Sequence, residues 1–191
     1  MDFPQRLRTP RLLFSRLENS DRHDFLRLRR DPRIAPLLDA PHATPAEDAF
    51  PAHSAHWAAH GFGWWAVREP HGNRFIGYGG LQSATVDELP AIDIAYAFLP
   101  ECWGRGYASE LVRVAVAQGF VRLNAREIVG FVHVTNAASR RVLERSGFRR
   151  EREVARAGRP HGLYRLSARS WCAAPHPFVA GQRAATDLQP V

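Results

Sequence analysis

Two glycines, Gly104 and Gly106, stand in the short segment Trp103–Ala108, between residues that predict a strand and residues that predict an amphipathic helix. Glycine lets the backbone approach a ligand closely and point successive N–H groups at it, and the following helix adds its positive end. This arrangement suits an anion such as a diphosphate, although an ordinary strand-to-helix turn has the same appearance. No Lys-Ser/Thr pair follows the glycines, and no dinucleotide-binding G-x-G-x-x-G follows a first strand.

Three histidines, His53, His56 and His60, recur on one face of a predicted helix. Their spacing is compatible with a metal ion, but no nearby cysteine and no acid of an H-E-x-x-H motif completes a site. We therefore expect an exposed helix face and no metal site. The thiols Cys102 and Cys172 are isolated, which predicts neither a disulfide framework nor a metal knuckle.

The elements before the glycines begin with an alternating strand, Arg11–Leu17. A helix is predicted from Ser20-Asp21 until Asp31-Pro32, and the proline-rich stretch Arg33–Ala43 reads as a loop. Thr44-Pro45-Ala46-Glu47 has the residues of a capping box and starts a helix that ends near Gly61.

Three antiparallel strands, the helix after the glycines and a strand–helix–strand–strand unit follow. Their predicted bounds are Gly63–Arg68, Phe75–Ser83, Ala91–Leu99, Ala108–Leu123, Glu127–Val134, Ala137–Ser146, Phe148–Val154 and Leu163–Trp171, with turns at Asp87-Glu88 and Gly158–Gly162. The order β-α-α-β-β-β-α-β-α-β-β predicts an α/β domain, residues 1–171, with one mixed, mostly antiparallel sheet and helices on both faces. Residues 172–191 lack periodicity and predict a loosely ordered tail.

The chain of 191 residues has a formal net charge of +7 and contains no lysine. Since its arginines are scattered among acids, we expect no nucleic-acid partner; a modest positive field suits a phosphate-bearing ligand equally well. The sequence has no apolar run long enough for a membrane span and no signal-peptide core at its start, so we expect no membrane partner and a cytoplasmic location.

Two longer motifs carry a family resemblance: Ala91–Glu110, which contains the glycine segment, and Asn136–Phe148 (Asn-Ala-Ala-Ser-Arg-Arg-Val-Leu-Glu-Arg-Ser-Gly-Phe). In order and spacing they resemble the GNAT N-acetyltransferase superfamily, most of all its RimJ/RimL-like branch that acetylates the N-terminal amines of ribosomal proteins. The resemblance extends over nearly the whole chain to about Trp171. It implies a GNAT-like fold and acetyl-CoA as cosubstrate.

The resemblance also implies which residues bind acetyl-CoA. The strand end formed by Tyr96, Ala97 and Phe98 would pair with the pantetheine arm. The backbone from the glycine segment into the helix would wrap the diphosphate; its residues are Gly104, Arg105, Gly106, Tyr107, Ala108 and Ser109. Asn136 would contact the cofactor arm and is equally suited to cap its helix. Trp103 stands where the superfamily often has Gln or Arg, which puts a side-chain contact to phosphate in doubt.

For catalysis, the resemblance implies direct attack of a primary amine on the thioester in a ternary complex, with no covalent enzyme intermediate. A backbone N–H near Ala97–Phe98 would polarise the carbonyl. Asp93, where family members often carry Glu, is a base candidate acting through water, or else a surface carboxylate paired with an arginine. His133 is the other candidate, or a structural histidine. Ser139 aligns with a family serine near the sulfur, or bonds only within its helix.

The acceptor is left open between a protein N-terminus and a small-molecule amine, because the variable region Arg33–Gly61 is expected to set specificity. Trp57, Trp64 and Trp65 either line that cleft or belong to the core. A non-catalytic CoA or acyl-CoA sensor is the alternative function, and a homodimer is possible.

Overall fold

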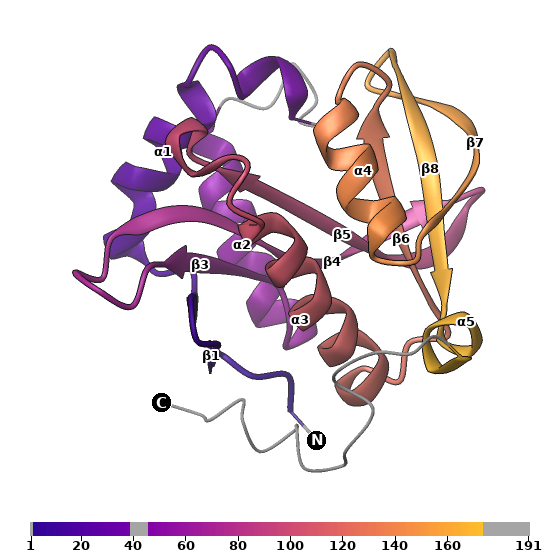
Figure 1. Ribbon diagram of the computed structural model, residues 1–191, viewed down its shortest axis with the longest axis horizontal. Helices are drawn as coiled ribbons and strands as arrows, with labels where there is room; N and C mark the ends of the chain where they lie inside the picture. Colours follow the sequence, from indigo (N-terminus) through magenta and orange to yellow (C-terminus); the bar gives the residue numbers. More distant parts are fainter. Residues whose placement is uncertain (1, 39–45, 174–191) are drawn as a thin grey trace.

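The computed structural model describes residues 2–38 and 46–173. One eight-stranded sheet, in the order β1-β2-β3-β4-β5-β6-β8-β7, runs through the molecule (Figure 1). Its strands are β1 (Arg6–Arg8), β2 (Leu13–Arg16), β3 (Trp64–Arg68), β4 (Phe75–Val86), β5 (Leu89–Phe98), β6 (Glu127–His133), β7 (Arg149–Arg156) and β8 (Arg159–Ser167). All neighbours are antiparallel except β5 and β6, so the predicted mixed, mostly antiparallel sheet is confirmed.

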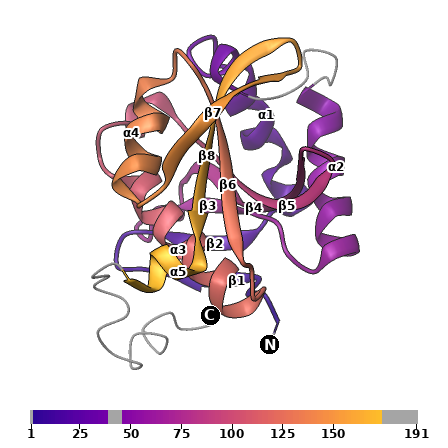
Figure 2. The same cartoon turned by 90° about the vertical axis from the view of Figure 1, so that its right-hand side faces the viewer.

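Helices cover both faces of this sheet, as predicted. In Figure 2, α1 (Arg22–Arg30) and α2 (Ala46–His60) lie on one side, and α3 (Tyr107–Arg122) and α4 (Ala137–Arg145) lie on the other. The remaining helical elements are α5 (Ala168–Ala173) and the 3₁₀ turns η1 (Asn19–Asp21), η2 (Ala35–Leu37) and η3 (Pro100–Cys102). None of the helices in the described ranges combines the length and the apolar character needed to cross a bilayer.

The largest departure from prediction concerns the last hairpin. The predicted turn Gly158–Gly162 is wrong, because Arg156 pairs with Arg159 and the chain reverses over two residues only. Ala157 and Gly158 adopt positive φ angles of 49° and 73°, which is the geometry of a two-residue hairpin turn. Gly162 therefore lies within β8, and Trp171, predicted as strand, belongs to α5.

Other elements differ at their ends. β1 was not predicted, since three residues are too few to show alternation. The turn at Asp87-Glu88 is confirmed, with both residues at positive φ, but β4 continues to Val86 to reach it. The predicted cap at Thr44 lies outside the described residues. So does most of the predicted tail, and a boundary at residue 172 stays a prediction.

The sheet opens between its two parallel strands. β5 and β6 pair at a single position, Asp93 with Val129, and run apart beyond it toward Phe98 (Figure 1). On the other side β5 stays paired with β4 along its whole length. Gly79 of β4 is needed there, because a Cβ atom on it would lie 2.6 Å from the Cβ atom of Tyr96. The Tyr96 side chain extends from this point across the opening toward α4, where its hydroxyl reaches the Ser139 carbonyl.

Candidate active site

Two cavities meet at the opening of the sheet. The loop groove, about 410 Å³, lies beside α3 and α4 and is lined by the glycine segment. The Asp93 pocket, about 280 Å³, is lined by residues of α1 and α2 on one side and of β6 and α4 on the other. Leu37 and Leu38 line both cavities, and so do three side chains with polar groups, Tyr96, Asn136 and Ser139. A molecule in the groove and one in the pocket would therefore meet at these three side chains.

The glycine segment forms one end of the loop groove. Gly104 and Gly106 have φ angles of 76° and 79°, in the left-handed region that other residues adopt only with strain. The first bond of α3 runs from the Glu110 N–H to the Gly106 carbonyl, so the N–H groups of residues 107–109 precede it and have no partner in the helix. A Cβ atom on Gly106 would meet only the Arg11 guanidinium, at 3.7 Å, so the backbone is open to a ligand.

A buried carboxylate that sequence reasoning missed fixes this segment. Glu110, in the first turn of α3, accepts from the Arg11 Nε at 2.7 Å and pairs with its Nη2. It also accepts from the Thr9 hydroxyl at 2.6 Å, and the Arg11 Nη1 donates to the Arg105 carbonyl at 3.0 Å. The N-terminal segment thus holds the loop from behind. Nothing local in the sequence signals this, because the partners are about a hundred positions apart.

Two side chains of the segment turn elsewhere. Arg105, predicted among the cofactor-binding residues, is absent from the lining of the groove; its Nη1 lies 3.9 Å from the Glu69 Oε1. The Trp103 indole, 48% exposed, donates from Nε1 to the Phe98 carbonyl at 2.8 Å. The Trp103 indole therefore occupies the main-chain carbonyl of Phe98 in β5. A Gln or Arg side chain at position 103 would instead reach toward phosphate. The other predicted cofactor-binding residues all line the groove.

The backbone of β5 alternates between its two neighbours. The Leu99 N–H donates to the Ile76 carbonyl of β4 at 2.9 Å, and Leu99 follows directly after the Phe98–Gly77 pair. In an antiparallel pair only every second residue turns its main-chain groups to the partner strand. Ala97 therefore faces β4, while Tyr96 and Phe98 turn their N–H groups toward the opening.

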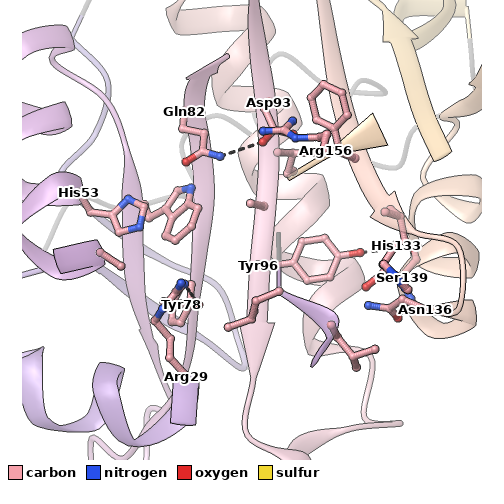
Figure 3. Close-up of a pocket in the computed structure, with 18 of the residues that line it drawn as sticks. Arg29, His53, Tyr78, Gln82, Asp93, Tyr96, His133, Asn136, Ser139 and Arg156 are labelled. Carbon is pink, nitrogen blue, oxygen red and sulfur yellow. Dashed lines mark hydrogen bonds between the residues drawn. The ribbon is translucent and has the colours of Figure 1, made fainter. Parts of the chain in front are cut away.

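Asp93 lies where β5 and β6 still pair, at one end of the pocket that bears its name. Only 3% of it is exposed, so the alternative of a surface carboxylate is wrong. Its Oδ2 accepts from the Gln82 amide at 2.8 Å, and the Arg156 guanidinium points toward it in Figure 3. Arg156 also stacks on the Phe131 ring at 3.8 Å. The carboxylate is thus held in a fixed orientation at the pocket wall.

His133 is buried at the end of β6 and lines the same pocket. Its Nδ1 accepts from the Thr135 N–H at 3.3 Å and lies 2.7 Å from the Thr135 hydroxyl. The ring also packs edge-on against His161, with centroids 5.2 Å apart. These contacts give His133 a structural role at the turn into α4.

The junction of the two cavities is built by the start of α4. The Asn136 Oδ1 accepts from the Ser139 N–H at 3.0 Å, which confirms the predicted helix cap. The Tyr96 hydroxyl donates to the Ser139 carbonyl at 3.4 Å, and burial raises the pKa of Tyr96, which keeps the hydroxyl protonated. Figure 3 shows Tyr96, Asn136 and Ser139 facing one another across the opening.

The histidine face of α2 is not the exposed surface that was expected, except at His60. His53 stacks on Trp64 with ring centroids 3.7 Å apart, and burial lowers its pKa to about 3. His56 accepts from the Ser83 N–H at 2.9 Å, and its Nδ1 lies 2.9 Å from the Phe62 carbonyl. Across the described ranges, no three His, Cys, Asp or Glu side chains are grouped to hold a metal ion.

The three tryptophans belong to the core, and Trp64 lines the Asp93 pocket as well. Cys102 is buried beside Arg74, and this burial raises the pKa of its thiol. A thiol in that state is a poor nucleophile, so Cys102 lines the loop groove without a nucleophilic role.

Comparison with known proteins decides the family. The model of the acetyltransferase (GNAT) domain matches residues 11–149. The chain belongs to the GNAT acetyltransferase family. This confirms the resemblance seen in the two motifs, and acetyltransferases of this family use acetyl-CoA as the acetyl donor.

Relatives and solved structures agree with this family assignment. The uncharacterized N-acetyltransferase YoaA of Bacillus subtilis is 32% identical over 87 residues, 46% of this chain and 49% of YoaA. A second curated relative from that organism, the uncharacterized protein YkkB, is matched over 61% of its length, so the chain spans half to three fifths of the length of these two relatives.

Among solved structures, an acetyltransferase from Agrobacterium tumefaciens superimposes with a TM-score of 0.74, at 24% identity, over 84% of this chain and 93% of that one. Mycobacterium smegmatis RimJ in complex with CoA-disulfide gives 0.72 at 19% identity, over 97% and 95%. At these identities the two structures support the GNAT fold alone.

Proposed function

We propose that this chain transfers the acetyl group of acetyl-CoA to a primary amine by direct attack in a ternary complex. The observation that carries the proposal is the meeting of the loop groove and the Asp93 pocket at Tyr96, Asn136 and Ser139. A thioester at that junction is reached by an amine from the opposite side of the sheet. No nucleophilic side chain is required between them.

The groove fits acetyl-CoA in its chemistry. The N–H groups of residues 107–109 have no partner within α3 and lie at its positive end; together with those of Gly104 to Gly106 they would hold the diphosphate. Arg141 and Arg145 of α4 also line the groove and place positive charge near the phosphates. The N–H groups of Tyr96 and Phe98 would pair with the pantetheine arm, and one of them would polarise the thioester carbonyl.

Ser139 is proposed as the proton donor to the departing thiolate. Its hydroxyl lies on the wall shared by both cavities, close to where the sulfur of the bound thioester would sit. The hydroxyl of Tyr96 is engaged with the Ser139 carbonyl and positions the start of α4. In this assignment Ser139 touches the reacting atoms, and Tyr96 supports it.

Asp93 is proposed as the base, acting through a water molecule. Direct attack needs a neutral amine, and removing the proton at pH 7 costs about 4–5 kcal/mol for a lysine-like amine and about 1 kcal/mol for an α-amine. A buried carboxylate held by Gln82 can take that proton without a change of rotamer.

The test is an acetyl-CoA consumption assay with small amines and peptide N-termini, following thiol release. Steady release that requires both an amine and the enzyme supports the proposal. If CoA binds in calorimetry and no amine in the panel gives release, the chain acts as a sensor of CoA and the catalytic proposal fails.

A further inference from the structure

The Asp93 pocket contains a second charged group that its proposed chemistry does not use. Arg29 of α1 lines the pocket and is only 8% exposed. Its Nη1 donates to the Tyr78 hydroxyl at 3.0 Å, and its guanidinium lies 5.5 Å from the centre of the Phe25 ring. Within the described part of the chain, no carboxylate pairs with Arg29.

The neighbours of Arg29 leave its charge uncompensated. Burial, with Arg29 nearby, lowers the pKa of His53 to about 3, so that ring is neutral. Burial raises the pKa of Tyr78, which is therefore a neutral phenol. An arginine keeps its proton in any protein environment, and a buried charge without a partner is costly. A site that retains such a charge is prepared for an anion.

Unsatisfied hydrogen-bond donors point the same way. Among the described residues, the buried Arg29 Nε and Trp64 Nε1 of this pocket have no hydrogen-bond partner; Arg156 Nη1 has none either, but it lies at the other end, beside Asp93. Buried donors in folded proteins nearly always have acceptors, so the two donors Arg29 Nε and Trp64 Nε1 indicate a ligand that carries acceptor atoms. A carboxylate offers two oxygens and the opposite charge, and it matches the fork of a guanidinium.

The position of Arg29 along the sheet separates it from Asp93. Arg29 is hydrogen-bonded to the side chain of Tyr78, and Asp93 is hydrogen-bonded to the side chain of Gln82. Gln82 lies four residues after Tyr78 in β4. At about 3.3 Å per residue, these two anchor points are roughly 13 Å apart, with the junction at Ser139 opening between them. One end of the pocket thus presents the Asp93 carboxylate and the other end the Arg29 guanidinium (Figure 3).

We propose that Arg29 binds a carboxylate carried by the acceptor, so that the substrate is a small amino acid-like molecule with a primary amine and an acid group. This inference rests on the proposed acetyl transfer and names its substrate class. The volume of about 280 Å³ suits such a compact molecule. A polyamine would place a second cation beside Arg29 and is disfavoured.

The experiment compares amines that differ only in the acid group: glycine with ethylamine, β-alanine with propylamine, and γ-aminobutyrate with butylamine. For at least one pair, kcat/KM of the amino acid is expected to exceed that of the alkylamine by about tenfold or more. Arg29→Met should abolish this ratio through KM for the amino acid, and Arg29→Lys should restore part of it. Calorimetry on the CoA-bound enzyme should show the same loss of amino acid binding in Arg29→Met.

The ratio is measured within one preparation, so a partly unfolded variant does not distort it. Arg27→Met, an exposed arginine of the same helix, is the matched control and should keep the wild-type ratio. Alkylamines used equally well by the wild type, or a preference that survives in Arg29→Met, would overturn the carboxylate assignment while leaving acetyl transfer intact. CoA binding without turnover of either series would overturn acetyl transfer itself, and the assignment with it.

Discussion

The substitution Gly106→Trp tests the main-chain cradle at the start of α3. Gly106 lines the groove with φ of 79°, and only the Arg11 guanidinium lies within 4 Å of its missing Cβ, so an indole there is expected to crowd the space proposed for the diphosphate. Three first-turn N–H groups at about 0.3–1 kcal/mol each supply roughly 1–3 kcal/mol. Their loss corresponds to a roughly fivefold to more than hundredfold rise in the Kd for CoA, measured by isothermal titration calorimetry.

Gly158→Trp is the matched control for this change. Gly158 has φ of 73°, no atom within 4 Å of its missing Cβ, and no part in either cavity. Each substitution is expected to cost about 1–2 kcal/mol of stability from the left-handed backbone alone, which thermal unfolding measures. Only Gly106→Trp should weaken CoA binding. An unchanged Kd in Gly106→Trp, or an equal loss in Gly158→Trp, would refute the placement of the diphosphate.

Three further perturbations follow from the same structure. Asp93→Asn should lower kcat/KM by about a hundredfold without changing the Kd for CoA; a change of only a few-fold would exclude Asp93 as the base. Glu110→Gln should lower the free energy of unfolding by about 1–2 kcal/mol in denaturant titrations and weaken CoA binding, because Arg11 loses its counter-ion; wild-type values for both would remove the loop-supporting role. Burial lowers the pKa of His53 from its ordinary 6.5 to about 3, so unfolding takes up a proton between these values and stability falls as pH drops below 6.5, by up to about 1.4 kcal/mol per pH unit. His53→Phe should flatten that slope in unfolding curves at pH 5 and 7; an unaltered slope would contradict the buried neutral ring.

The elements that the sequence predicted well are those whose signals are local. The glycine segment and the cap at Asn136 both combine a turn-forming residue with the start of a helix, so spacing alone was sufficient. The tight turn at Ala157-Gly158 was missed because an alanine at positive φ has no sequence signature, whereas Gly162 looked like a turn residue. Local chemistry thus placed the helices and most strands to within a few residues.

The side chains that give the pocket its character depend on distant contacts. Arg29 of α1 is buried against Tyr78 of β4, and its hydrogen bond to that hydroxyl joins residues far apart in the sequence. The partners of Glu110, Thr9 and Arg11, likewise come from the distant N-terminal segment. Asp93 was recognised as a candidate base with a surface carboxylate as the alternative, since alternation in a strand does not reveal which helices cover each face. Burial by tertiary neighbours, which no window of sequence contains, decided all three.

The central claim is that the open backbone between β5 and α3 holds a diphosphate and delivers a thioester to the junction of the two cavities. A crystal structure of the chain with CoA tests it most directly. The account predicts diphosphate oxygens within hydrogen-bonding distance of the N–H groups of Gly104–Ser109 and the thiol beside Ser139. A nucleotide bound at another surface, with that backbone closed by side chains, would contradict it.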